Sequence, residues 1–259
     1  NTPMETTVLE ALKAAVVDDN GFVTSAEYKT AIATLQTALD NAKASVAAYS
    51  NLKKALDDVK SFELTLAEDA EAKTTFQAAI AEVESAYAAV TITAEEVAGK
   101  IETVNAAFIV AVKAQTAPNS NMSPLIVNND FESGRLDGWT STTGAQNNTI
   151  ASNKSGDITG KFYENWNGAP YSGTMSQTIT NLPNGKYTVK IAAFRSGGTG
   201  EVYVFANDGQ TLVETDNGVY YEATGTVLDG TLTFGLKSVN GGCNWMGLDN
   251  VSLTYMGVD

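Results

Sequence analysis

Acidic residues stand beside two short apolar segments that are far apart in the sequence. Asp130 and Glu132 flank Phe131 in the first segment, and Asp249 precedes Val251 in the second. Carboxylate oxygens combined with backbone carbonyls make the oxygen-only cages that hard cations prefer, and Ca²⁺ accepts irregular cages more readily than Mg²⁺. The alternative is that these carboxylates are surface caps or ion-pair partners of lysines. The residues alone leave both possibilities open.

Aromatic and amide side chains are concentrated in the stretch from Tyr163 to Tyr171, which includes Asn165 and Trp166. Sugar rings present apolar C–H faces that stack on aromatic rings, and their hydroxyls hydrogen-bond to amide and charged side chains. We therefore expect Trp166, with Tyr163, Tyr171 and Asn165, to bind a saccharide. A core position for Trp166 is the open alternative.

Other residues offer further ligand contacts. Arg195 is either a donor to sugar hydroxyls or an ion-pair partner of Glu164. Tyr203 and Phe205 alternate with valines, so if the valines fill a core, the two rings lie on the outer face of a sheet as a platform. Tyr220 is a third candidate for that platform.

The composition argues against catalysis and against binding of nucleic acid. The chain has no His, which removes the usual acid/base group near neutral pH, and its single cysteine, Cys243, excludes an intrachain disulfide. It lacks a nucleophile elbow and a phosphate loop, so we expect no enzyme activity. With 16 Lys and Arg against 30 Asp and Glu, the net charge is −14, and no basic patch suits a phosphate backbone.

No apolar run is long enough to cross a bilayer, so we expect no transmembrane segment. The chain shows no secretory leader. We nevertheless expect a secreted or cell-surface protein from which a leader has been removed.

The functional candidates need elements to position them, and the sequence divides into two halves. Residues 1–117 are rich in helix-forming residues with apolar spacings of three and four, which predicts an antiparallel bundle of four helices. Four Thr-x-x-Glu capping boxes mark the expected helix starts, at Thr2, Thr24, Thr65 and Thr93. The second helix is predicted to bury a seam that begins Tyr28, Ile32, Leu35, Leu39.

Residues 118–124 contain two prolines with Asn and Ser between them, and we expect a linker there. From residue 125 to 259, short apolar runs alternate with turn residues, which predicts a β-sandwich of eight strands. The first strand is expected at 125–131, beside a last strand at 248–255. Other predicted strands include 160–166, 173–179 and 230–236.

Several motifs in the β half carry a resemblance. Asn-x-Asp-Phe-Glu at 128–132, Gly-Trp at 138–139 and Leu-Asp-Asn-Val-x-Leu at 248–253 resemble motifs of the jelly-roll carbohydrate-binding modules of the galactose-binding-like superfamily. The runs 163–167, 176–179 and 182–187 are similar to the same modules. The resemblance implies a jelly-roll fold and a structural Ca²⁺ held by Glu132 and Asp249, with Asp130 as a carbonyl donor. It also implies that Trp139 and Trp245 pack under loops.

Together these features predict a non-catalytic, secreted or cell-surface carbohydrate-binding protein. The β-sandwich is expected to bind a polysaccharide or glycan. The helical half resembles helical modules of large extracellular bacterial proteins and would be a spacer or a docking element for a protein. The alternative is a structural or adhesin-like interaction module that binds no glycan.

Overall fold

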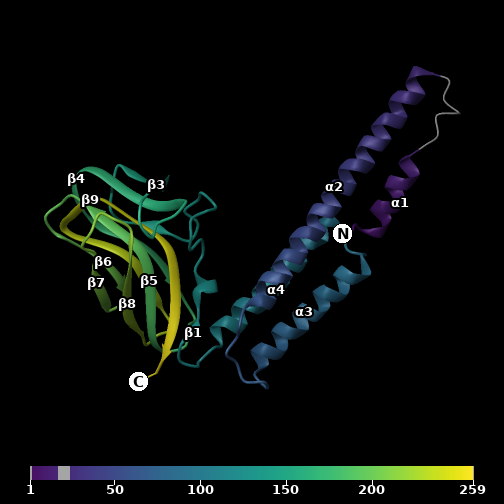
Figure 1. Cartoon of the computed structure of the whole chain (residues 1–259). Helices are drawn as coiled ribbons and strands as arrows, with labels where there is room; N and C mark the ends of the chain where they lie inside the picture. The colour runs from purple at the N-terminus through teal and green to yellow at the C-terminus, as the bar shows by residue number, and fades with distance from the viewer. Residues whose placement is uncertain (1, 17–23, 259) are drawn as a thin grey trace. The chain divides into compact units, whose positions relative to one another are not determined.

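The computed structural model describes residues 2–16 and 24–258, which form a helical part and then a β part (Figure 1). The helices in these residues are α1 (Thr6–Ala15), α2 (Ser25–Ser61), α3 (Glu71–Ala89) and α4 (Ala94–Lys113). None of the four combines the length and apolar character that a membrane span requires. The predicted fold class, a helical bundle followed by a β-sandwich, is confirmed.

Two of the predicted capping boxes are present. The Thr24 hydroxyl accepts a hydrogen bond from the Glu27 N–H, and the Glu27 carboxylate accepts one from the Thr24 N–H at 2.8 Å. Thr93 and Glu96 make the same reciprocal pair of bonds. These bonds satisfy backbone donors that have no partner within the first turn of α2 and of α4.

The boxes predicted at Thr2 and Thr65 are wrong. Helix α1 begins at Thr6 and α3 at Glu71, and neither has a side-chain cap. Thr65 instead donates from its N–H and its hydroxyl to Oε1 of Gln115, at 2.8 and 2.9 Å. Its hydroxyl is therefore engaged outside α3.

Apolar side chains close the helical part around the middle of α2. The Tyr49 hydroxyl donates to the Ile92 carbonyl at 3.0 Å, and the Tyr49 ring lies 5.7 Å from that of Tyr87. Phe108 packs edge-on against Phe62, 5.2 Å away. The fully buried apolar residues of this part include Tyr49, Leu52, Val83 and Val104.

The first part of the predicted seam on α2 is not buried. Tyr28, Ile32, Leu35 and Leu39 are 44%, 67%, 39% and 38% exposed. The seam becomes buried only at its next position, Ala42. The prediction of one buried seam along the whole helix is therefore wrong for its first four positions.

The chain divides into two compact units, and the division falls inside α4. One unit contains the helices up to Ala111, and the other contains Leu64–Leu66 together with the chain from Val112 onward. The expected linker 118–124 belongs to the β unit, because Ser120 and Asn121 pair with Tyr255 and Thr254.

The β unit is antiparallel throughout its named strand pairs. Its elements are β1 (Ser120–Asn121), the 3₁₀ turn η2 (Ser123–Leu125), β2 (Thr140–Ser141), β3 (Asn147–Ser152), β4 (Lys161–Ile179), β5 (Gly185–Ser196), β6 (Glu201–Ala206), β7 (Gly209–Leu212), β8 (Val219–Val227) and β9 (Leu232–Gly257). Strands β4 and β9 pair with each other along most of their lengths.

The pairing of these two long strands organises two layers of strands. In one layer, the second half of β4 and the first part of β9 lie between β2 on one side and β6 with β7 on the other. In the second layer, the first half of β4 and the last part of β9 lie between β3 on one side and β5 with β8 on the other. Each long strand therefore takes part in both layers (Figure 1).

Irregular positions let β4 and β9 pass from one layer to the other. The register of β4 shifts between Trp166 and Gly173, and Asn240 and Gly241 of β9 have positive φ. Such bulges bend a strand without ending it. The sequence therefore predicts two strands, 160–166 and 173–179, where the structure has one, and likewise divides β9.

The predicted first strand at 125–131 is wrong. The segment begins in the η2 turn and has positive φ at Asn128 and Phe131, which a strand does not allow. It nevertheless lies against β9, because the Asn129 carbonyl accepts a hydrogen bond from the Val251 N–H at 2.9 Å. The expected proximity of the two acidic motifs therefore holds without strand pairing.

Aromatic side chains from both layers meet inside the sandwich. Trp139, 6% exposed, contacts Tyr163 of one layer and Phe234 of the other, with ring centroids 6.4 and 5.8 Å away. Its indole N–H donates to the Val127 carbonyl at 3.0 Å. Trp139 therefore has the structural role that the sequence predicts.

Candidate functional site

A row of four side chains crosses the second layer and contains two tryptophans. Asn147 of β3 pairs with Trp166 of β4, Trp166 pairs with Trp245 of β9, and Trp245 pairs with Ser196 of β5. Residues directly opposite each other on neighbouring strands point to the same face. Trp166 is 41% exposed, and Trp245 is half-buried. We call this row the tryptophan row.

Charged side chains lie next to the tryptophan row. The Trp245 indole N–H donates to Oε2 of Glu164 at 2.8 Å, which fixes the indole and the carboxylate together. The Trp245 ring stands edge-on to Phe194, 4.7 Å away. The Lys154 ammonium lies 4.6 Å from the centre of Trp245 and 4.3 Å from that of Phe194, within the range of a cation–π interaction.

A glycine makes room for this aromatic packing. Gly247 lies between Glu164 and Phe194 in the next row of the same face. A Cβ at this position would come within 2.6 Å of the Phe194 ring and 2.8 Å of the Tyr163 carbonyl. Any other residue at position 247 would displace the ring that supports Trp245.

Tyr163 and Asn165 lie on the opposite face, inside the sandwich. Both are fully buried. The Tyr163 hydroxyl and the Asn165 amide both donate to Oδ1 of Asn148, at 2.5 and 2.8 Å. Oδ1 of Asn165 accepts from the hydroxyls of Ser141 and Thr143, at 2.9 and 2.7 Å. Direct sugar contact by Tyr163 and Asn165 is therefore corrected to a supporting role beneath the row.

Tyr171 and Arg195 are also occupied within the protein. Tyr171 is 7% exposed and donates to the Asn165 carbonyl at 2.9 Å, and burial raises the pKa of its hydroxyl. The Arg195 guanidinium donates to the carbonyls of Gly197 and Gly200, at 2.7 and 3.2 Å. Arg195 thus holds the loop after β5, and of the five predicted sugar-binding residues only Trp166 presents a largely exposed ring.

The alternative platform is partly present. Val202 and Val204 are fully buried, so Tyr203 and Phe205 face outward, as expected. Phe205 is nevertheless only 8% exposed, and the Lys237 ammonium lies 5.8 Å from its ring centre. This face therefore offers less exposed aromatic surface than the tryptophan row.

The carboxylates predicted to bind metal are brought to one short segment. Oε1 of Glu132 accepts from the Lys161 N–H at 2.8 Å, and Oδ2 of Asp249 accepts from the Thr159 N–H at 3.2 Å. Oδ1 of Asp130 accepts from the Glu132 N–H at 3.3 Å. We call Asp130, Glu132 and Asp249 the carboxylate cluster.

The electrostatics of this cluster centre on Asp249, which is fully buried. Its Oδ1 has no hydrogen-bond partner among the described residues. Burial, followed by the charges of Glu132 and Asp130, raises the pKa of Asp249 to about 6. An unpaired buried carboxylate oxygen is costly unless a cation compensates it, so this donor set fits a hard cation.

The same cluster is not a ready-made group of side-chain ligands. In residues 2–16 and 24–258, no three acidic, histidine or cysteine side chains are arranged so that they could hold a metal together. A cation at Asp249 would therefore need backbone carbonyls or water among its ligands.

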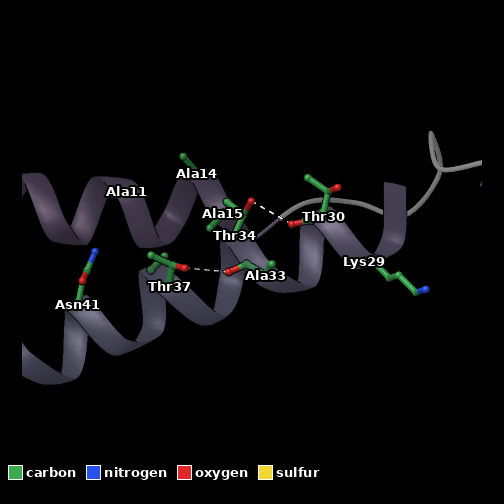
Figure 2. A pocket seen from close by; sticks show the side chains of 10 residues that line it. Ala11, Ala14, Ala15, Lys29, Thr30, Ala33, Thr34, Thr37 and Asn41 are labelled. Atoms are coloured by element: carbon green, nitrogen blue, oxygen red, sulfur yellow. Dashed lines mark hydrogen bonds between the residues drawn. The ribbon is translucent and has the colours of Figure 1, made fainter. Parts of the chain in front are cut away.

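The helical part contains a hollow between α1 and α2 (Figure 2). The hydroxyls of Thr34 and Thr37 donate to carbonyls of their own helix, at 3.0 Å each, so these side chains offer mainly their methyl groups. Alanines of both helices complete most of the lining. The hollow has the character of loose helix packing rather than of a polar ligand site.

Sequence reasoning missed two members of the site. Trp245 was expected to pack under a loop, and Lys154 carried no motif. The signal available for Trp245 was its place in the last strand, but the strand that faces it depends on how β4 and β9 are paired. Lys154 reaches the rings from the loop that follows β3, a strand that the sequence did not predict.

The comparisons with known proteins found structures but no sequence relatives. No family model matches the chain, and no curated protein matches it. TmCBM61 in complex with β-1,4-galactotriose is 16% identical with a TM-score of 0.39, and the match covers 54% of this chain and 99% of that one. The CBM22-1 xylan-binding domain of Paenibacillus barcinonensis Xyn10C is 13% identical with a TM-score of 0.41, covering 51% and 94%.

A third similar structure is a cyclase from Fischerella sp. TAU, at 16% identity and a TM-score of 0.42, covering 52% of this chain and 96% of that one. The neighbours thus include both carbohydrate-binding modules and enzymes. Their likeness does not decide between binding and catalysis, and the functional argument rests on the geometry of the site.

Proposed function

We propose that the β-sandwich binds a saccharide on the tryptophan row. The observation that carries this proposal is the exposed ring of Trp166 directly opposite Trp245 on the neighbouring strand. Two indoles at one strand spacing, about 4.8 Å, offer an apolar surface on the scale of a sugar ring. Aromatic stacking in proteins is worth roughly 1 kcal/mol beyond area burial, so a single site would be weak.

The polar neighbours favour a neutral sugar. Glu164 can accept hydrogen bonds from sugar hydroxyls, while Asn147 and Ser196 extend the row on both sides with groups that both donate and accept. The net charge of −14 opposes the approach of a highly anionic glycan. The substrate class we propose is therefore a neutral polysaccharide.

We propose binding without catalysis, outside the cell. Of the residues described in the tryptophan row and the adjacent row, only Glu164 carries a carboxylate, and glycosidases generally use two. An extracellular or cell-surface location would give the protein access to polysaccharides. The helical unit would then act as a spacer or as a docking element.

The test is the variant Trp166→Ala in the full chain. We expect saccharide binding on a glycan array to be lost, because the largest exposed ring of the row is removed. Since Trp166 is 41% exposed, the variant should keep its fold. Tyr220→Ala is the matched control, because Tyr220 is also 41% exposed and lies on β8.

Two results would contradict the proposal: unchanged binding in Trp166→Ala, or equal loss in Tyr220→Ala. If the wild-type chain bound no glycan at all, the adhesin-like alternative would replace glycan binding as the function of the sandwich.

We further propose that the carboxylate cluster binds a structural Ca²⁺. The support is the buried Oδ1 of Asp249, which lacks a partner among the described residues, and the carboxylate of Glu132 on the same 159–161 segment. Such an ion would link the 128–132 segment to β9. A ligand that binds only the folded form stabilises it by about 2.7 kcal/mol at a hundredfold excess over its dissociation constant.

Chelation should therefore lower the melting temperature of the β unit, followed by tryptophan fluorescence. Added Ca²⁺ should restore it in the wild type but not in Glu132→Gln. An unaffected melting temperature, with no metal found by elemental analysis of the purified protein, would exclude the site.

A further inference from the structure

The first half of α2 displays an apolar seam that no described element covers. Tyr28, Ile32, Leu35 and Leu39 follow one another at steps of four, three and four residues, and each is more than a third exposed. They extend over roughly 16 Å at ~1.5 Å per residue. We call these four residues the α2 seam.

Helix α1 packs on the other side of α2 (Figure 2). Thr30 and Thr37 line the hollow beside α1, and Figure 2 shows them on the side of α2 next to that helix. Ile32 and Leu39 each follow one of these threonines by two residues, which is a rotation of roughly 200° about a helix of 3.6 residues per turn. Helix α1 is therefore not the partner of the α2 seam.

The α2 seam continues directly into the core of the helical unit. Ala42, three residues beyond Leu39, is 3% exposed, and Tyr49, seven residues further, is fully buried. Tyr49 contacts the carbonyl of Ile92, between α3 and α4. The same spacing thus serves as a packed helix interface in the second half of α2 and lies open in the first half, where it keeps the periodicity of a coiled coil.

The order of the steps identifies the partner. A spacing of four, three and four is the same in both directions, so a second α2 lying antiparallel places Tyr28 opposite Leu39 and Ile32 opposite Leu35. A two-fold axis then passes between residues 33 and 34, and one patch serves both copies, as a closed dimer requires. We propose that this chain forms an antiparallel homodimer through the α2 seam.

Charges next to the seam are compatible with this pairing. The positions that immediately flank it are Lys29, Ala31, Gln36 and Ala38. In the antiparallel register Lys29 faces Ala38 and Gln36 faces Ala31, so no like charges oppose each other at these positions. The small alanines also permit a close approach of the two helices.

The α2 seam is short, so the dimer dissociates on dilution and its dissociation constant is roughly micromolar or weaker. Sedimentation equilibrium of the full chain over about a hundredfold range of concentration should show monomer and dimer. Ile32→Lys and Leu35→Lys should each weaken the dimer more than about tenfold, because a charge would enter an apolar contact.

Val110→Lys is the matched control, since Val110 is 56% exposed on α4 and lies outside the seam. Circular dichroism checks that each variant stays helical. Ile32→Ala, which keeps a good helix former, replaces Ile32→Lys if that variant unfolds. A wild-type chain that stays monomeric, or lysine variants that dimerise as the wild type does, would overturn the proposal.

Cysteine pairs test the register. Cys243 is fully buried, so an added surface cysteine is the reactive thiol. A mixture of Ile32→Cys and Leu35→Cys chains should cross-link more readily than Ile32→Cys alone, because these two positions face each other only in the antiparallel dimer. Preferred cross-linking of Ile32→Cys with itself would indicate a parallel pair and contradict the antiparallel arrangement.

Discussion

At the scale of single residues, Asp249 concentrates the electrostatic strain of the β unit. It is fully buried, one of its oxygens has no partner among the described residues, and its pKa is raised from 3.8 to about 6. The folded state therefore holds a proton that the unfolded chain releases at lower pH. Ionisation of Asp249 costs stability unless a cation is bound.

The sign of the pH dependence follows from this shift. In metal-free protein, the contribution of Asp249 is fully present below pH 3.8 and is lost as the pH rises through about 6. At about 1.4 kcal/mol per pKa unit, the loss is on the order of 2 to 3 kcal/mol.

Asp249→Asn should remove this decline, so that the variant melts at a higher temperature than metal-free wild type at neutral pH. Thermal melts between pH 4 and 7 in metal-depleted buffer measure the effect. The control Asp137→Asn, at an exposed aspartate, should keep the wild-type profile. A wild-type profile in Asp249→Asn would refute the assignment.

At the scale of elements, a local pattern foretold what a segment can do but not which partner it finds. Thr24 and Thr65 open the same Thr-x-x-Glu motif. Only Thr24 caps a helix, whereas Thr65 bonds to Gln115 and lies 2.5 Å from the Ser120 hydroxyl. Gln115 is distant in sequence, so no local signal could reveal this bond.

The two threonines therefore stabilise different units. Thr24→Ala should destabilise the helical unit by about 1 kcal/mol, the usual cost of losing an N-cap. Thr65→Ala should instead destabilise the β unit, to which Leu64–Leu66 belong. All three tryptophans follow residue 117, so their fluorescence reports the β unit, while circular dichroism follows the helices.

We expect Thr65→Ala to shift the fluorescence transition and Thr24→Ala to shift the helical one. Equal shifts of both transitions in both variants would mean that the two units unfold together, contrary to this assignment.

At the scale of the whole molecule, composition and periodicity were sufficient to predict helices followed by a β-sandwich. They also predicted that the acidic motifs around Glu132 and Asp249 come together. They could not predict which face of β4 is outward, because the bulge after Trp166 changes the register and a shift by one residue exchanges the two faces. For that reason Tyr163 and Asn165 were expected at the surface, and Trp245 was not.

Strand β9 pairs with β1, β4, β5 and β6, and so forms part of both layers. During synthesis, the earlier strands therefore leave the ribosome before their central partner exists. The helices, whose contacts are more local, can fold at that stage, whereas the sandwich must wait for residues 232–257. Until then the apolar faces of β4 and β5 remain open to association with other chains, which makes the time taken to translate the 232–257 segment a period of vulnerability for this protein.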